Sequence, residues 1–214
     1  MKIQKIKNRT ILFTNSIQGG WDLNVQLILG NTYNYIIDTG LGSDSMEPIK
    51  EYLINDPKPI IVINTHYHWD HVWGNFSVKS GLIISHKLCR DLIESTWEET
   101  LIKNEKYVQG EVKMQLPNMV FEEELYFPED QIRIIYAPGH TIDSISVLDE
   151  KEKVLHAGDN IGDTLEELVP NLSVEKEVFV ETLMKYNEMD FDTCISGHNI
   201  VLDKQVINRI LNLL

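Results

Sequence analysis

Residues 64–75 read Asn64-Thr65-His66-Tyr67-His68-Trp69-Asp70-His71-Val72-Trp73-Gly74-Asn75. Within this stretch, a His-x-His-x-Asp-His motif places three imidazoles and a carboxylate within six positions. The motif directly follows the apolar run 59–63, which predicts a buried strand. Imidazoles and carboxylates suit Zn²⁺ and Fe²⁺, and two histidines at i and i+2 in extended backbone can bind one metal. The motif therefore predicts a metal site after a strand. The alternative is a surface loop that is rich in histidine by chance.

The second half of the chain repeats one arrangement, in which an apolar segment is followed by a glycine-containing loop and a potential ligand. Glycine permits the tight backbone turn that directs a side chain back over the end of a strand. A single Gly-His dipeptide is equally compatible with a structural histidine, so the recurrence carries the argument. The segments and their ligands are 132–136 with His140, 154–156 with Asp159, and 191–196 with His198.

Apolar runs and helical periodicity alternate along the chain and predict helices that cover a mixed sheet system. Because the potential ligands follow four separate strands, we expect the site along one edge of those sheets. The predicted strands are 10–14, 24–29, 32–37, 60–64, 82–85, 132–136, 154–156 and 191–196. The predicted helices are 46–54, 86–104, 174–188 and 203–214.

Three local features accompany this assignment. Gly30-Asn31 is typical of a tight hairpin turn between two of the strands. Ser45 is a suitable N-cap for the first helix. The segment 106–127 is irregular and rich in large apolar residues. It could line a substrate pocket or form a lid, although packing beneath a long loop is the favoured interpretation.

Length and composition predict a single soluble globular domain, residues 1–214. The sequence contains 19 Lys and Arg residues against 33 Asp and Glu residues, a formal charge of −14. Such an acidic surface repels nucleic acid and anionic lipid, so we expect a small-molecule substrate and neither of those partners. The start of the chain lacks an apolar signal region, and the only cysteines, Cys89 and Cys194, share no short spacing. A reduced, cytoplasmic protein is the simplest expectation.

Five elements in a fixed order resemble the motifs of the metallo-β-lactamase-fold superfamily of metallohydrolases. These elements are Asp38, the His-x-His-x-Asp-His motif, His140, Asp159 and His198. The resemblance extends from Asp38 to His198, which is most of the chain. It implies an α/β fold, a four-layer αβ/βα sandwich, with a dinuclear metal site in the groove where two sheets meet.

The resemblance also implies a ligand set of two triplets and a bridging residue. The first metal would be held by His66, His68 and His140, the second by Asp70, His71 and His198, and Asp159 would bridge both. Asp38 is similar to a residue that supports the ligands from outside, since such contacts orient ligand imidazoles. A carboxylate that caps a turn at the end of a strand is an equally good interpretation of Asp38.

The ligand set defines the chemistry that we expect. Two divalent cations about 3.5–4 Å apart share a water and lower its pKa towards neutrality, and the bridging hydroxide is then the nucleophile. The sequence accordingly contains no Gly-x-Ser-x-Gly elbow. Asp70 is the best candidate to hold and relay the proton. Zn is the expected metal, although Fe and Mn also suit these ligands.

The superfamily supports many reactions on one metal site, so resemblance alone does not select a substrate. Residues 65–71 are most similar to glyoxalase II and related thioesterases, but glyoxalase II carries a basic C-terminal domain, and only sixteen residues follow His198 here. The bridging Asp159 argues against β-lactam hydrolysis as the main activity, because dizinc β-lactamases lack that carboxylate. We therefore expect hydrolysis of a small carbonyl ester, thioester or lactone.

Two alternatives remain open at this point. A mononuclear iron sulfur dioxygenase of the persulfide-oxidising type has similar motifs but uses only the first triplet. A structural or sensory metal site is the third interpretation, although structural sites are usually closed. The oligomeric state is left undetermined. A structural role is the favoured interpretation of His86 and His156, with His156 packed at a strand end. A substrate contact is the alternative for His86 and is also considered for Tyr67.

Overall fold

The apolar run before the histidine motif forms strand β5 (Ile60–Ile63). A computed structural model describes residues 1–78 and 81–214 of the protein. β5 pairs in parallel with β4 (Asn34–Ile37) on one side and with β6 (Leu82–His86) on the other. All four of its residues are apolar and three are buried, as expected for an interior strand of a parallel sheet.

The strands of the described residues form two sheets. Sheet A has seven strands in the order β1 to β7, and its other members are β1 (Lys2–Lys5), β2 (Thr10–Ile17), β3 (Trp21–Leu29) and β7 (Met119–Phe121). Sheet B has six strands in the order β13-β12-β11-β10-β9-β8. They are β8 (Glu124–Phe127), β9 (Ile132–Tyr136), β10 (Ile145–Asp149), β11 (Val154–His156), β12 (Thr193–Ile195) and β13 (Leu202–Asp203).

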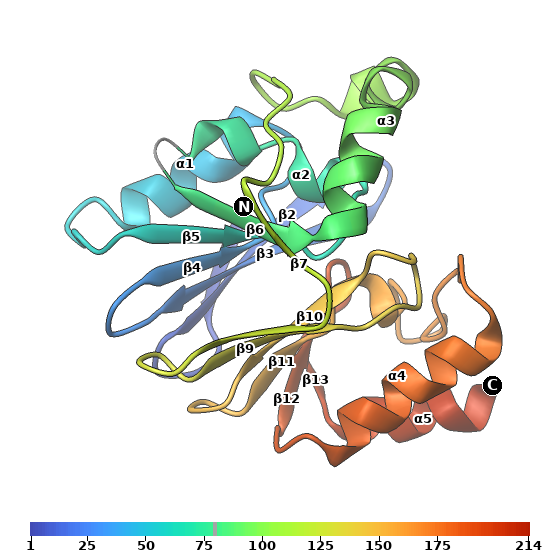
Figure 1. The fold of residues 1–214 in the computed structure, drawn as a ribbon. Helices are drawn as coiled ribbons and strands as arrows, with labels where there is room; N and C mark the ends of the chain where they lie inside the picture. Colours follow the sequence, from blue (N-terminus) through green and yellow to red (C-terminus); the bar gives the residue numbers. More distant parts are fainter. Residues whose placement is uncertain (79–80) are drawn as a thin grey trace.

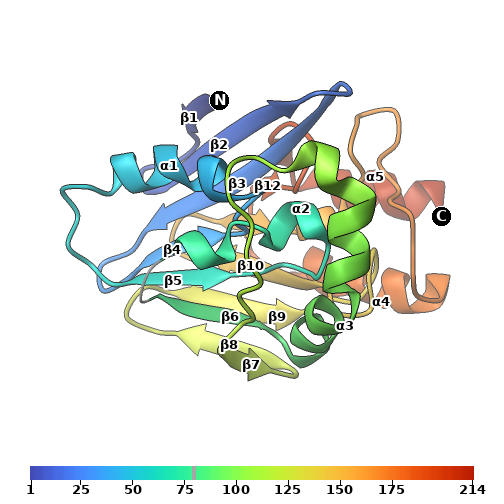
Figure 2. The ribbon, with the colours of Figure 1, turned by 90° about the horizontal axis from the view of Figure 1, so that it is seen from above.

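Helices cover the outer faces of both sheets, as Figures 1 and 2 show. The helices on sheet A are α1 (Ser43–Tyr52), α2 (Trp69–Val72) and α3 (Lys87–Asn104), and those on sheet B are α4 (Lys176–Glu188) and α5 (Gln205–Leu213). Short 3-10 helices lie at η1 (Asn75–Ser77), η2 (Glu105–Tyr107) and η3 (Gly158–Asn160). This arrangement confirms the predicted four-layer αβ/βα sandwich.

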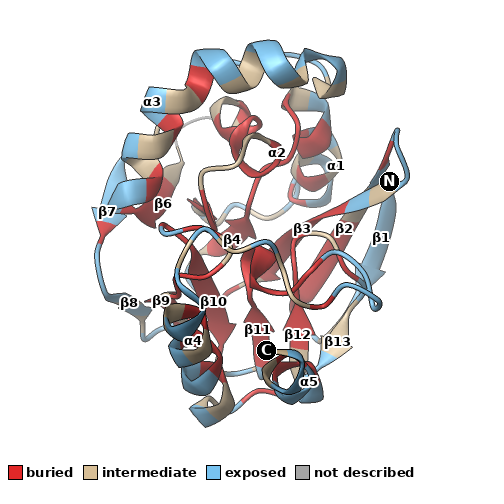
Figure 3. Cartoon of the chain, turned by 90° about the vertical axis from the view of Figure 1, so that its right-hand side faces the viewer, coloured by how far each residue is buried: buried red, intermediate tan, exposed pale blue. Residues whose placement is uncertain are grey.

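The alternation of side chains along β4 and β5 explains how one sheet serves two cores. Ile61 and Ile63 face sheet B and pack with apolar residues of β9 and β10, whereas Val62 faces α1. Successive side chains of a strand point to opposite faces, so apolar runs are needed where both faces are covered. Figure 3 shows the same layering, with buried strands inside and helices exposed on their outer sides.

Buried polar contacts join the two sheets at the ends of their strands. Arg9, before β2, donates through Nε and Nη2 to the carboxylate of Asp149 at 2.9 and 2.5 Å and to the carbonyl of Asp130 at 2.7 Å. The Asp130 carboxylate accepts bonds from the N–H groups of Asn31, Thr32 and Tyr33 and from the Tyr35 hydroxyl. These contacts fix the register between the sheets.

Two local predictions were wrong in detail. The expected two-residue turn at Gly30-Asn31 is a longer connection between Leu29 and Asn34, because the Asp130 carboxylate holds the N–H groups of this connection. Helix α1 begins at Ser43 rather than after Ser45, and Gly42 precedes it. The Ser45 hydroxyl lies inside the helix and accepts a bond from the N–H of Leu41 at 3.1 Å.

The segment 106–127 contains more regular structure than the sequence indicates. It includes β7 at the edge of sheet A and β8 at the edge of sheet B, and only residues 122–123 separate them. Val108, Val112 and Leu116 pack against the core around α2 and α3, which confirms packing for that part. In the described parts of the chain, no helix combines the length and the apolar composition that crossing a membrane requires.

Asp130→Asn tests the contact between the sheets. Burial raises the pKa of Asp130, but bonds from the N–H of Thr32 and the hydroxyl of Tyr35 outweigh it and lower the pKa below 3.8. The ionised carboxylate therefore stabilises the fold at neutral pH, and this contribution is lost as the pH falls through the lowered pKa. We expect the variant to lose about 1–3 kcal/mol of unfolding free energy in urea at about pH 7.

The difference in unfolding free energy between wild type and Asp130→Asn should shrink as the pH falls below 3.8, the pKa of this carboxyl in the unfolded chain. Glu129→Gln, at the exposed neighbouring position, is the matched control and should leave the stability unchanged. A difference that persists undiminished down to about pH 2 would contradict the assigned role of the carboxylate.

Candidate metal centre

The first four candidate residues lie on the short connection that leaves β5 and on the helix that follows it. His66 and His68 are on the loop between β5 and α2, and Asp70 and His71 are in the first turn of α2. The loop residue His68 has extended backbone (φ −61°, ψ 143°), and helical geometry begins at Trp69. His66 and His68 therefore precede the helix. Asp70 and His71, in its first turn, bring their side chains to the same place.

The other three candidates come from sheet B. His140 follows β9, Asp159 lies in η3 after β11, and His198 follows β12. At Gly197 a Cβ atom would lie 2.1 Å from Asp159 Oδ1 and 2.7 Å from His71 Cε1, so only glycine permits this close approach. The recurring strand, glycine and ligand pattern of the sequence thus brings three distant segments to one point.

A single carboxylate oxygen lies at the centre of the cluster. Asp159 Oδ2 lies 3.2 Å from His198 Nε2, 3.3 Å from His71 Nε2, 3.6 Å from His66 Nε2 and 3.8 Å from His140 Nε2. The four imidazoles come from three different loops. Asp159 is therefore positioned to contact groups on both sides of the cluster at once.

The seven candidates fall into two compact groups, within each of which one ligand atom per residue lies within 4.8 Å of every other. The groups are His66, His68, His140 and Asp159, and Asp70, His71 and His198. In the first, His140 Nε2 faces His68 Nδ1 at 3.1 Å; in the second, Asp70 Oδ2 lies 3.4 Å from His198 Nε2. The two groups contain the two triplets that the resemblance implies. Asp159 falls in the first group, and its Oδ2 also lies 3.3 and 3.2 Å from His71 and His198 of the second. Binding of metal by these residues remains a prediction.

Several atoms of the cluster have unsatisfied bonding capacity. His66 Nε2, His71 Nε2 and Asp159 Oδ1 are buried and have no hydrogen-bond partner among the residues described. An unpaired buried polar group costs about 1–3 kcal/mol, more when it is charged. Nitrogen lone pairs and carboxylate oxygens directed at one point are the donor set of a Zn²⁺, Fe²⁺ or Mn²⁺ site. The residues present therefore fit divalent metal ions.

Asp38 contacts this cluster from behind. Its carboxylate accepts bonds from the N–H and hydroxyl of Thr65, both at 2.7 Å, and lies 2.8 Å from His71 Nδ1. A carboxylate can only accept here, so His71 Nδ1 carries a proton and its Nε2 faces the cluster. Asp38 has a φ of +62°, an uncommon conformation for a residue other than glycine. Of the two interpretations of Asp38, support of a candidate ligand is the one that the geometry favours.

Three further imidazoles are oriented in the same way. His140 Nδ1 donates to the carbonyl of Asn171 and His198 Nδ1 to the carbonyl of Asp22, each at 2.8 Å. The Thr65 hydroxyl gives its proton to Asp38 and therefore accepts from His66 Nδ1, 3.1 Å away. These bonds orient the three rings and direct each Nε2 towards the cluster. Sequence reasoning missed Asn171 and Asp22, because their contribution is a backbone carbonyl.

Burial keeps two imidazoles of the first group, those of His66 and His68, neutral. It lowers the pKa of His66 well below its usual value of 6.5, and the neighbouring His71 lowers it further. Burial also lowers the pKa of His68 to about 4, although Asp70 acts in the opposite direction. Neutral imidazole is the form that binds a metal, so these two side chains need not lose a proton at neutral pH.

The carboxylates of Asp159 and Asp70 stabilise positive charge on the imidazoles of the second group. Burial disfavours ionised Asp159, but His198 and His71 hold its pKa well below 3.8. Burial lowers the pKa of His71, yet Asp159 and Asp70 outweigh it and raise the pKa well above 6.5. The same two carboxylates raise the pKa of His198 to about 9 against the effect of burial. A divalent cation would supply the positive charge that these protons otherwise provide.

The cluster forms the floor of an open cleft with a volume of about 1110 Å³. Aromatic side chains form one wall: Trp69 stacks on Tyr107 with ring centroids 5.3 Å apart, and Trp21 lies edge-on to both. The loop 162–171 forms the opposite wall. Because His68, Asp70, His140, Asp159 and His198 all line the cleft, a small molecule can reach the candidate ligands.

The remaining residues singled out from the sequence have structural contacts. His86 accepts a bond from the N–H of Leu88 at the start of α3 and stacks on Tyr136 with centroids 4.4 Å apart. His156 is buried and accepts from the N–H of Gly158 at 3.2 Å. Tyr67 packs against the core around α2 and α3. The expectation that His86 and His156 are structural is consistent with these contacts.

Comparison with known proteins agrees with the geometry. Residues 19–198 match the sequence profile of the Metallo-beta-lactamase superfamily. Among solved structures, metallo-beta-lactamases from Hirschia baltica and Pontibacter korlensis cover 99% of this chain, with TM-scores of 0.78 and 0.76. The alignments cover 96% and 97% of those chains at 15% and 16% identity, so they demonstrate a common fold.

Curated relatives are similar over part of their length. The bovine acyl-coenzyme A thioesterase MBLAC2 is 24% identical over 173 residues, which cover 68% of this chain and 61% of the bovine protein. This chain thus spans about three-fifths of that relative. A probable metallo-hydrolase of Methanocaldococcus jannaschii is 30% identical over 151 residues, covering 66% of this chain and 68% of the archaeal protein. With most of its length matched by the family profile, the chain belongs to the metallo-beta-lactamase superfamily.

Proposed function

We propose that this protein is a dinuclear metal-dependent hydrolase that cleaves a small carbonyl ester, thioester or lactone. The observation that carries the proposal is the position of Asp159 Oδ2, within 3.2–3.8 Å of four imidazole nitrogens. This oxygen lies on the floor of an open cleft. A carboxylate that lies between two ligand groups is suited to bridge two adjacent cations.

The proposed ligand assignment follows the two groups of the cluster, with Zn as the favoured metal and Fe or Mn as alternatives. It gives His66, His68 and His140 to the first cation, Asp70, His71 and His198 to the second, and Asp159 to both. When bound, two divalent cations supply a Lewis acid for the substrate carbonyl and lower the pKa of a shared water. A protein that held one iron alone would leave the second group without a role.

The chain contributes preorganisation and a route for the proton. Nδ1–H bonds to Asp38, Asn171 and Asp22 hold three imidazoles in one tautomer and orientation, so little reorganisation is needed on binding. Asp70 lines the cleft with 8% of its surface exposed, and its carboxylate can therefore reach a substrate. We assign Asp70 to accept the proton of the attacking water and to pass it to the leaving group.

Metal analysis tests the dinuclear proposal. Protein purified without chelators should contain about two divalent ions per chain, and chelation should abolish hydrolysis until Zn²⁺ is restored. His198→Gln should retain about one ion, because the second group loses one of its three members. His86→Gln, outside the cluster, is the control and should retain both. A single iron per chain with oxygen uptake would instead support the dioxygenase alternative.

Asp70→Asn tests the proton relay. Loss of a general acid–base group typically costs about 10²–10⁴-fold, so we expect kcat to fall by at least about 10²-fold. The metal content of the variant must be measured in parallel, because Asp70 is also a proposed ligand. Asp91→Asn on the exposed side of α3 should leave kcat unchanged. Near-normal turnover of Asp70→Asn with both metals bound would remove Asp70 from this role.

Thr65→Val tests the support behind the ligands. The substitution removes the hydroxyl that donates to Asp38 and accepts from His66 while it preserves the size of the side chain. Loss of such an outer contact typically weakens metal binding about 10–100-fold, measurable by competition with a chromogenic chelator. Thr65→Ser keeps the hydroxyl and should restore most of the affinity. Equal metal affinities of the two variants would show that the hydroxyl does not orient the ligands.

A further inference from the structure

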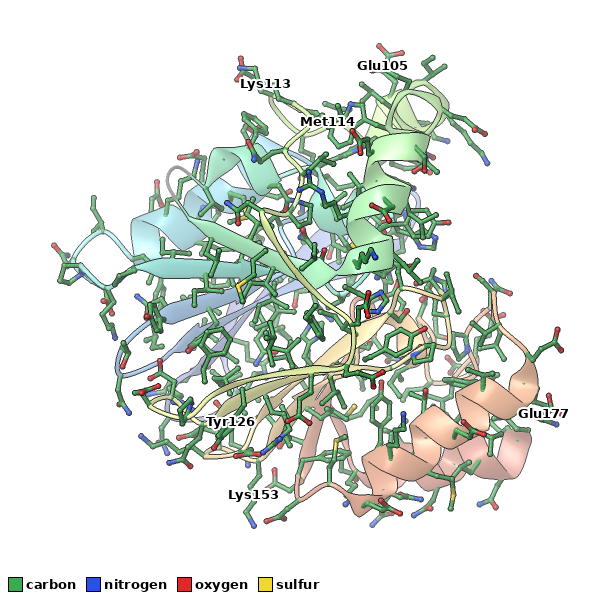
Figure 4. The ribbon with its side chains drawn as sticks, viewed as in Figure 1. Glu105, Lys113, Met114, Tyr126, Lys153 and Glu177 are labelled. Carbon is green, nitrogen blue, oxygen red and sulfur yellow. The ribbon has the colours of Figure 1, made fainter. Side chains whose placement is uncertain are left out.

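Outside the candidate ligands, the charged side chains that line the cleft are of one sign. Besides the candidate ligands, Asp163, Glu166 and Glu167 line it from the loop 162–171. Of the residues that the structure describes, no lysine or arginine lines the cleft. The ammonium of Lys106 lies over the ring of Tyr107 at 4.7 Å but is not part of the lining. Figure 4 shows Lys113 at the outer edge of the molecule, with its side chain directed outward.

The acidic wall is held in a fixed position relative to the metal centre. The N–H of Gly162 donates to the carbonyl of Leu168 at 2.9 Å, and Leu168 is buried against α4 and α5. Asn199 Nδ2 donates to the carbonyl of Gly162 at 2.7 Å, next in sequence to the candidate ligand His198. Asn171, at the end of the loop, accepts the Nδ1–H of His140. Both ends of the acidic wall are therefore bonded to segments that carry candidate ligands.

The carboxylates of this wall differ from those on the floor. Two divalent cations at the floor would more than balance the negative charges of Asp70 and Asp159, which lie in the two ligand groups. Asp163, Glu166 and Glu167 belong to neither group, and no ion pair found among the described residues includes them. Their negative charge therefore remains uncompensated. It acts on the part of a bound substrate that extends away from the reacting carbonyl. The opposite wall carries no charge of its own: Trp69 and Tyr107 stack on each other there, and Trp21 lies edge-on to both.

Resting on the proposed hydrolase function, we infer that the cleft selects ester or thioester substrates by charge, favouring cationic over neutral and neutral over anionic groups beyond the carbonyl. Each carboxylate about 8–10 Å from a substrate charge changes binding about twofold in water-like surroundings. Three carboxylates therefore change binding about tenfold, and a cation and an anion should differ by up to about 100-fold at low ionic strength. The wall repels the phosphates of a coenzyme A thioester, so the expected substrates differ from the one named for the bovine relative.

The test uses three acetyl thioesters of similar size and different charge: acetylthiocholine, S-(3,3-dimethylbutyl) thioacetate and 3-(acetylthio)propionate. Thiol release reports kcat/KM for all three with the metal-loaded protein. We expect kcat/KM of the cationic thioester to exceed that of the anionic one by about 10–100-fold at low salt. At about 0.5 M NaCl the difference should be only a few-fold, because salt screens exposed charges. Asp163→Asn, Glu166→Gln and Glu167→Gln combined should remove most of this difference, that is, reduce the ratio by about 10–100-fold at low salt.

A control variant separates the wall from the overall charge of the protein. Glu51→Gln, Glu129→Gln and Glu188→Gln combined remove the same number of charges at exposed positions outside the cleft lining. This control should leave the cation-to-anion ratio within about twofold of wild type. An equal decrease in both triple variants would overturn the inference, because it would assign selection to the net charge rather than to the wall.

The remaining outcomes distinguish a failure of the charge selection from a failure of the proposed hydrolase function. Equal or faster hydrolysis of the anion would overturn the charge selection and leave the hydrolase function standing. No hydrolysis of any thioester would count against the hydrolase function. Binding would then decide the charge selection, using tryptophan fluorescence with S-methylthiocholine and 3-(methylthio)propionate, which cannot be hydrolysed. Tighter binding of the cation supports the inference, and equal or tighter binding of the anion overturns it.

Discussion

A buried carboxylate encircled by imidazole nitrogens is the constraint on which the rest of the structure depends. Asp159 Oδ2 approaches four ring nitrogens within 3.8 Å, and Asp159 Oδ1 has no hydrogen-bond partner among the residues described. Removing a carboxylate from water costs several kcal/mol unless opposite charge and hydrogen bonds compensate. Every loop at this edge of the sandwich is placed to provide that compensation, through neutral donors, protonated imidazoles or bound cations.

The two sheets contribute to this centre in complementary ways. Sheet A supplies the histidine motif after β5 and Asp38 after β4, whereas sheet B supplies His140, Asp159 and His198. Neither sheet alone carries a complete group around Asp159. The buried contacts of Arg9 with Asp149 and Asp130 therefore affect the cluster although they lie outside it. They hold the two sheets in the relative position that brings the two sets of side chains together. A cation bound by residues of both sheets would therefore stabilise their docking by linkage.

The sequence allowed accurate prediction wherever chemistry resides in side chains at regular spacing. The run before His66, the recurring glycine loops and the amphipathic helices predicted a mixed sheet system covered by helices, with potential ligands along one edge. The resemblance of the five motifs implied the sandwich and the grouping of the cluster. Other features leave no such pattern. Asp22 and Asn171 act through backbone carbonyls, which every residue possesses. The edge strands β7 and β8 are only three and four residues long, and Asp130 controls a turn about 100 residues away, so local periodicity could not reveal them.

The use of main-chain carbonyls to orient ligands has a consequence for how such a protein can evolve. The carbonyls of Asp22 and Asn171 fix His198 and His140 whatever side chains those positions carry, provided that the backbone keeps its path. Mutations can therefore alter the walls of the cleft residue by residue without disturbing the geometry of the centre. Side chains on the walls can therefore change substrate preference, while main-chain atoms keep the cluster in place. New preferences can evolve in this way without loss of the cluster.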